Sequence, residues 1–119
     1  RITNVNWNQH YFIDFGFDSD NLRALYLGIS KHKENEGCVP DLANKLNREF
    51  VSGKGPNLST EWWMNFEDKY YNWDSDSLLL LYGRQQESLN YFTEKFRRLI
   101  ELSDQTITEY IKKTGNVSL

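Results

Sequence analysis

The stretch YFIDFGF, residues 11–17, decides the fold, because large apolar side chains alternate in it with polar or small ones. One side of an extended chain then carries Tyr11, Ile13, Phe15 and Phe17, while Asp14 and Gly16 fall on the other. Alternation of this kind is typical of a half-buried β-strand. The segment therefore predicts a strand with one face on a hydrophobic core.

The residues that follow predict a hairpin. Residues 18–21 read DSDN, four short polar residues whose side chains can bond their own backbone in a turn. Leu25, Leu27 and Ile29 then alternate with Tyr26 and Gly28, which repeats the period of the first strand. We expect an antiparallel hairpin from Tyr11 to Ser30.

A short helix and a third strand are expected next. Leu42, Leu46 and Phe50 recur every four residues after Pro40, which indicates an amphipathic helix. Residues 52–60 hold two glycines and a proline and predict a loop. Alternation returns in residues 62–66, WWMNF, which favours a strand.

The C-terminal half predicts two helices. Asp74 or Ser75 is placed to cap a short helix through Leu78–Leu81. A second, long helix is expected from Gln86 to Lys113, with a core-facing side made of Leu89, Phe92, Phe96, Leu99 and Ile107. The fold class is therefore α+β: a small antiparallel sheet with a short helix and a long C-terminal helix packed on it.

Length and charge narrow the classes of function. A chain of 119 residues fits a single domain, residues 1–119, and its first residue is not Met, so we expect a fragment or the C-terminal domain of a longer protein. The net charge of −3 argues against a general phosphate-binding surface. A lone cysteine, Cys38, suits a reducing compartment, and we expect a cytoplasmic protein.

One motif carries the spacing of a metal-dependent nuclease. Glu67-Asp68-Lys69 has the E-x-K pattern in which one face of a strand presents a carboxylate to Mg²⁺ and an ammonium to the attacked phosphate. Asp14 on the first strand could supply the further acidic ligand, provided that it converges with Glu67. A solvated strand face explains the same residues, and we favour that interpretation.

Two smaller clusters have ordinary explanations. Lys31-His32-Lys33 could contact phosphate, but Glu34 and Glu36 offset its charge, so we expect an exposed loop. Cys38 and His32 could act as a nucleophile and a base, but no third group orients them. The sequence therefore predicts no catalytic residue, no metal site and no cofactor.

The aromatic residues give the strongest indication of a contact surface. Adjacent residues of a strand point to opposite faces, so of Trp62 and Trp63 one belongs to the core and the other does not. If all helices cover one face of the sheet, the other face exposes aromatic side chains. We expect this binding surface to consist of Trp63, Tyr26 and Phe12.

The order of several segments resembles a known family. These segments are the hairpin strands at residues 11–15 and 25–29, Glu61-Trp62-Trp63, Tyr70-Tyr71-Asn72-Trp73 and the closing stretch Leu99–Ile111. Together they are similar to the C-terminal part of a bacterial family in the PD-(D/E)XK nuclease superfamily. The resemblance implies that the metal-binding residues precede this region, so that no catalytic residue carries over to this chain.

The leading hypothesis is accordingly a non-catalytic accessory or binding domain of a bacterial PD-(D/E)XK nuclease-like protein. Its partner would be another domain of the same protein or a separate protein, and nucleic acid only through a larger assembly, with no membrane. The alternative is a stand-alone protein–protein interaction domain of the toxin-neutralising or sensor type. A second alternative is a metal-dependent nuclease that uses Asp14, Glu67 and Lys69.

Overall fold

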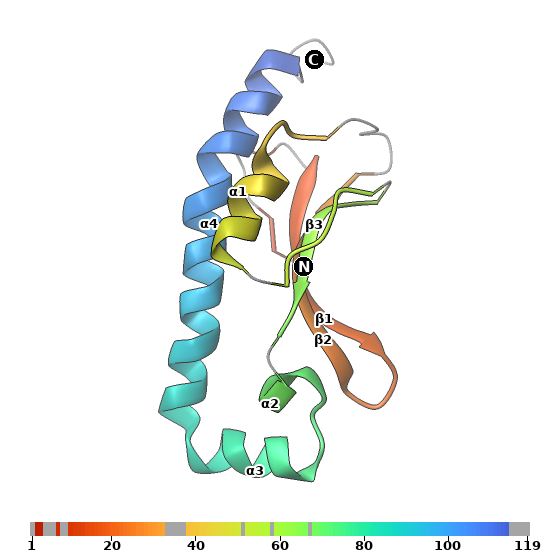
Figure 1. Ribbon diagram of the computed structural model, residues 1–119. Coiled ribbons are helices and arrows are strands. Elements are labelled where there is room, and N and C mark those ends of the chain that lie inside the picture. Colours follow the sequence, from red (N-terminus) through yellow and green to blue (C-terminus); the bar gives the residue numbers. More distant parts are fainter. Residues whose placement is uncertain are drawn as a thin grey trace.

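Figure 1 presents the computed structural model, in which a three-stranded sheet is covered by helices on one side. The structure describes residues 2–3, 7, 10–32, 38–50, 52–57, 59–66 and 68–114, with only the backbone of residues 68, 69 and 114. The elements follow one another as β1 (Tyr11–Ser19), β2 (Arg23–Lys31), α1 (Leu42–Glu49), β3 (Thr60–Asn65), α2 (Asp68–Tyr71), α3 (Ser75–Gly83) and α4 (Gln85–Thr114).

The sheet confirms the expected antiparallel arrangement. β1 and β2 form the predicted hairpin, with Ile13 opposite Ile29 and Phe15 opposite Leu27. β3 pairs with the other edge of β2, and an irregularity beside Ile29 and Ser30 leaves Glu61 as an additional residue in β3. The strand order is therefore β1-β2-β3, and β2 lies in the middle.

One face of the sheet forms the core, as the alternation predicts. Leu25, Leu27, Ile29 and Trp62 are completely buried on it, and Tyr11, Ile13 and Met64 nearly so. In Figure 1, α1 and α4 lie together on this side of the sheet, and α2 and α3 lie beyond its lower end. The fold class expected from the sequence, an α+β sheet with a short helix and a long C-terminal helix, is confirmed.

Only some of the α4 residues that were expected to face the sheet do so. Leu99 and Ile107 are fully buried, and Phe92 and Phe96 pack against the core while half exposed. Leu89 is 59% exposed, so its predicted place on the sheet is wrong. At that turn of the helix the inward position belongs to Ser88, whose hydroxyl lies 3.0 Å from the Tyr70 hydroxyl in a buried hydrogen bond.

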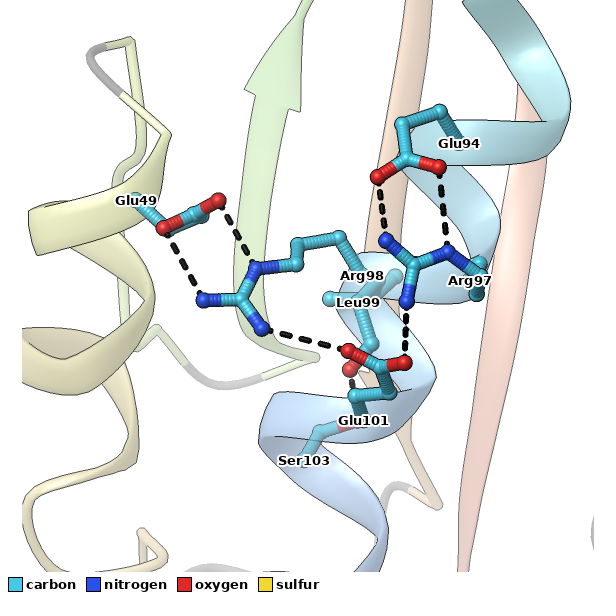
Figure 2. A network of polar contacts seen from close by, with 7 residues as sticks. All are labelled: Glu49, Glu94, Arg97, Arg98, Leu99, Glu101 and Ser103. Atoms are coloured by element: carbon cyan, nitrogen blue, oxygen red, sulfur yellow. Dashed lines mark hydrogen bonds and ion pairs between the residues drawn. The ribbon is translucent and has the colours of Figure 1, made fainter. Parts of the chain in front are cut away.

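Helix α1 is held against both β3 and α4. Trp62 Nε1 donates to Asn47 Oδ1 at 2.8 Å, and the Trp62 ring lies 5.2 Å from that of Phe50 at the end of α1. Towards α4, Arg98 Nε donates to Glu49 Oε1 at 2.8 Å, and Arg98 also contacts Glu101 (Figure 2). The hydrogen bond from Arg98 lowers the pKa of Glu49. This ion pair is exposed, so it orients the two helices more than it stabilises them.

The short helices pack at the lower end of the sheet. Asp74 caps α3 as predicted, since its carboxylate accepts from the Ser77 backbone N–H at 3.0 Å. The turn before α3 also contacts the hairpin, because Asn72 Oδ1 accepts from the Ala24 N–H at 3.1 Å. α2 has only four residues and was not expected from the sequence. No helix in the described part of the chain is long and apolar enough to cross a lipid bilayer.

The first prediction compares two leucines of α4. Leu99→Ala should lower the free energy of unfolding by about 2–5 kcal/mol, because it removes a completely buried side chain and leaves a cavity. Leu89→Ala should cost less than about 0.5 kcal/mol, because the side chain is mostly exposed. Urea titration followed by circular dichroism measures both values. Equal losses would mean that α4 is rotated on the sheet.

Candidate binding surfaces

The face of the sheet turned away from α1 and α4 collects the residues expected to bind. We call it the open face and define it by Phe12, Asp14, Gly16, Tyr26, Gly28, Ser30, Trp63 and Asn65, the strand positions whose side chains or Cα hydrogens point to this side. Among the described residues, no helix covers this side of the sheet (Figure 1). The three expected aromatic residues, Phe12, Tyr26 and Trp63, therefore share one face, and each is half-buried.

Trp63 lies opposite Gly28, and the close approach of the two strands requires glycine there. Gly28 is directly opposite Trp63 in the β2–β3 pairing. A Cβ atom on Gly28 would lie 2.9 Å from Trp63 Cβ and 2.8 Å from the Trp62 carbonyl oxygen, which is too close for either neighbour. The strands approach each other there because residue 28 has no side chain. The same close approach leaves Asp14, Gly28 and Trp63 in one cross-strand row.

Tyr26 lies beside a second glycine, Gly16, but the structure does not require glycine at that position. Gly16 is opposite Tyr26 in the hairpin, and Tyr26 Cε1 lies 3.8 Å from the position of a Cβ on Gly16. That distance is an ordinary van der Waals contact, so the ring lies over backbone that would otherwise be bare. With two glycines in its rows, the open face is low and flat between its aromatic side chains.

The polar residues of the open face are partly engaged with each other. The Ser30 hydroxyl donates to the Asp14 carboxylate across the hairpin. Asn65 stands opposite Tyr26, and its backbone carbonyl accepts from the Ser52 hydroxyl at 2.9 Å. The Asp14 carboxylate is thus hydrogen-bonded within the sheet. It is not part of a described group of acidic side chains that could bind a metal ion.

Lys69 of the nuclease motif lies in a helix and not on a strand. β3 ends at Asn65, and Lys69 belongs to helix α2, while Glu67 lies outside the described residues. The geometry assumed for the E-x-K pattern, with both side chains on one strand face, therefore does not apply. Within the described residues, no three His, Cys, Asp or Glu side chains come close enough together to hold a metal ion.

A buried pair of charges occupies one end of the sheet. Glu61 is 1% exposed and Lys31 6% exposed, so the prediction that Lys31 belongs to an exposed loop is wrong. Lys31 is the last residue of β2, and Lys33 lies outside the described residues. The Glu61 carboxylate accepts from the Val39 N–H at 2.8 Å and so ties the segment before α1 to β3.

Burial affects the ionisation of Glu61 and of its neighbour Tyr11. Removal from water raises the pKa of Glu61, although the Val39 N–H and the Lys31 charge act in the opposite direction. Burial also raises the pKa of Tyr11, and the neighbouring Glu61 charge adds to that effect. Because the Glu61 carboxylate binds the Val39 N–H and so fastens the segment before α1, we assign Glu61 a structural role.

A hollow of about 270 Å³ lies between α1, β3 and α4. Its walls include Phe50, Phe66 and Tyr91. The Lys95 ammonium lies 5.8 Å from the centre of the Phe50 ring and 5.3 Å from that of Tyr91. The Lys95 ammonium is therefore already placed for cation–π contact with both rings. For this reason the hollow offers little uncovered aromatic surface to a ligand.

Helix α3 carries an apolar surface that the sequence reasoning did not anticipate. Leu78, Leu79 and Tyr82 are 47%, 69% and 79% exposed. We call these three residues the α3 stripe. The signal was present in the sequence, because four consecutive leucines must surround a helix, and a helix this short cannot bury all of its sides.

No family model, curated protein or solved structure matches this chain. The resemblance to the PD-(D/E)XK nuclease superfamily therefore stays a prediction from the quoted segments.

The two glycines of the open face provide a matched pair of variants. Gly28→Ala should lower the free energy of unfolding by about 1–3 kcal/mol, because the added methyl group must displace backbone of β3. Gly16→Ala should be neutral or slightly stabilising, since the new methyl group meets only the Tyr26 ring at an ordinary distance. Thermal and urea unfolding measure the difference, and an equal effect at both sites would contradict the strand register.

A pH-dependence test addresses Glu61. The pKa of Glu61 is raised in the folded protein, so its favourable contribution is present at low pH and is lost as pH rises through the folded pKa. Glu61→Gln keeps an acceptor for the Val39 N–H and removes the buried charge. The variant should therefore be at least as stable as the wild type at pH 7, and this advantage should disappear below the ordinary glutamate pKa of 4.5.

The control for this test is Glu61→Ala, which leaves the Val39 N–H without its acceptor and should be destabilising by about 1–3 kcal/mol at either pH. Urea titrations at pH 7 and pH 4 measure all three proteins. A Gln variant that loses stability at pH 7 and recovers it at pH 4 would show that the attraction of the Lys31 charge outweighs the burial of Glu61.

Proposed function

We propose that this chain is a non-catalytic binding domain that docks another protein surface with the open face of its sheet. The observation that carries the proposal is the presence of Phe12, Tyr26 and Trp63, all partly buried, on the one side of the sheet that no described helix covers. Aromatic side chains in such positions are the residues that most often anchor protein interfaces.

The shape and polarity of the open face suit a protein partner. Gly16 and Gly28 keep it flat between the aromatic side chains, so a second flat surface can approach closely. Asp14 and Asn65 lie among the rings and supply polar groups of the kind found at the rim of an interface. The net charge of −3 disfavours nucleic acid as a direct partner.

The resemblance suggests which protein surface is bound. In the family that the sequence resembles, the corresponding region follows a nuclease-like core, so the first partner to consider is a preceding domain of the same protein. The chain would then be an accessory domain in a bacterial, cytoplasmic protein. The alternative is a separate protein partner, as in a toxin-neutralising or sensor domain, and the same open face would serve both cases.

The test replaces Trp63, the largest aromatic residue of the open face. Trp63→Ser should leave the chain folded, because Trp63 points away from the core, and should weaken docking about 30-fold or more, as loss of an interface hot spot of about 2 kcal/mol does. The binding partner for the assay is the polypeptide that precedes this chain in its gene product, expressed separately. Sedimentation velocity of the mixture measures the complex.

Leu89→Ser is the control, since it removes a mostly exposed apolar side chain from α4 without touching the open face. Docking that survives Trp63→Ser but not Leu89→Ser would reject the open face as the binding surface. A gene product without a preceding domain would reject the accessory role and leave the separate partner. Unfolding of the Trp63 variant would instead mean that the ring supports the sheet, and Trp63→Phe would then separate the two effects.

A further inference from the structure

Strand β1 lies at the edge of the sheet, and its outer side presents backbone groups. The hairpin bonds the even-numbered residues of β1 to β2, as the hydrogen bond of 2.8 Å from the His32 N–H to the His10 carbonyl shows at its start. In an antiparallel pair, the alternate residues turn their N–H and C=O groups away from the partner strand. The odd-numbered residues between Tyr11 and Ser19 therefore direct these groups outward.

Another segment of the chain already pairs with this outer edge at one point. The Ile2 N–H donates to the Ile13 carbonyl at 2.8 Å, and the Ile13 N–H donates to the Ile2 carbonyl at 2.9 Å. This is an antiparallel bridge, so the edge accepts an extended chain there. Further along β1, no described residue bonds the outward N–H and C=O groups of Phe15 and Phe17. These groups are left for a strand that continues the line of Ile2.

Exposed apolar side chains lie beside the same part of the edge. Phe15 points to the core side of the sheet, yet it is 39% exposed. Its ring lies 5.2 Å from the ring of Phe96 on α4, and Ile100, one helical turn further, is 40% exposed. Directly opposite residues of paired strands place their side chains on the same side of the sheet. An apolar residue added opposite Phe15, as Ile2 is opposite Ile13, would therefore cover part of this exposed surface.

The other side of β1 is acidic. Asp14 and Asp18 alternate with the phenylalanines and so point towards the open face, and Asp20 is exposed in the turn that follows. β1 itself contains no lysine or arginine. Opposite charges stabilise a cross-strand pair and like charges destabilise it. The edge therefore favours a strand with basic residues on this side, and a second copy of β1 would bring acidic residues together.

We propose that the outer edge of β1, from Phe15 to Ser19, binds an extended segment of a partner protein as a fourth strand of the sheet. The segment runs antiparallel to β1. It carries apolar residues opposite Phe15 and Phe17, and lysine or arginine opposite Gly16 and Asp18. In strand addition of this kind, backbone hydrogen bonds supply affinity and alternate side chains supply specificity. The site uses the edge of the sheet and not the rings of the open face, so it goes beyond the docking function proposed above.

The experiment uses a synthetic probe peptide, acetyl-Thr-Lys-Val-Lys-Val-amide, in which the two valines are placed opposite Phe17 and Phe15. The peptide is titrated into the isotope-labelled 119-residue chain and followed by the NMR signals of the backbone amides. We expect saturable shifts that are largest at the Phe15 and Phe17 N–H groups, because these groups gain hydrogen-bond acceptors. Such a short peptide should bind with a dissociation constant of about 1 mM.

Three modified peptides test the mode of binding. Methylation of both valine nitrogens removes the donors that face β1 and should weaken binding about tenfold or more. Methylation of both lysine nitrogens is the matched control and should change the affinity less than about twofold, since these nitrogens face away from β1. A peptide with glutamate in place of both lysines should bind about tenfold more weakly, because it meets the acidic side of the strand.

Variants of the protein locate the site. Asp18→Lys should weaken binding of the lysine peptide and strengthen binding of the glutamate peptide, whereas Glu109→Lys, an exposed charge reversal on α4, should leave both unchanged. Ile100→Ser should weaken binding by removing part of the exposed apolar surface. Trp63→Ser should keep the peptide affinity, which distinguishes this edge from the open face.

Three results would overturn the proposal. The first is the absence of shifts at Phe15 and Phe17 up to the solubility limit of the peptide. The second is an equal effect of the two kinds of methylation, which would show that no strand pairing takes place. The third is binding that is lost in Trp63→Ser but kept in Asp18→Lys, which would move the contact to the open face.

Discussion

The structure depends on covering one side of a three-stranded sheet. The alternation in β1, β2 and β3 directs Ile13, Leu27, Ile29 and Trp62 to the same face, and their burial supplies the main driving force for folding. A single long helix, α4, covers much of that face, while α1 covers the part beside β3. Because the described helices lie on one side of the sheet, the opposite side has no described helix packed on it.

This one-sided arrangement separates stability from contact. Trp62 and Trp63 are neighbours in sequence, but Trp62 is completely buried against Phe50 and Asn47, whereas Trp63 lies on the open face. Substitution on the open face can therefore change binding without removing the core. The α3 stripe can likewise be substituted without removing the core, because the buried side of α3 holds the helix without it.

The buried carboxylate of Glu61 connects two segments of the chain. Glu61 exists as an additional residue at the irregularity between β2 and β3, and its carboxylate binds the Val39 N–H just before α1. A buried carboxylate is costly unless its oxygen atoms are bonded, and here the bond fastens a segment that the strands themselves do not hold. Lys31 moderates the charge from the end of β2. The raised pKa values of Glu61 and Tyr11 therefore accompany burial and do not by themselves mark an active site.

The local sequence determined the elements, because period and capping chemistry act over a few residues. The alternation of residues 11–17, the four-residue spacing of Leu42 and Leu46, and the carboxylate of Asp74 each specified a strand, a helix or a helix start that the structure contains. They also specified that Trp63, Tyr26 and Phe12 share the face opposite the core. Only the tertiary structure decided how far each side chain is covered, since that depends on neighbours distant in sequence. Thus Ser88, and not Leu89, contacts Tyr70, and Lys31 is buried near Glu61. Helix α3 exposes to water the leucines that do not pack on the core.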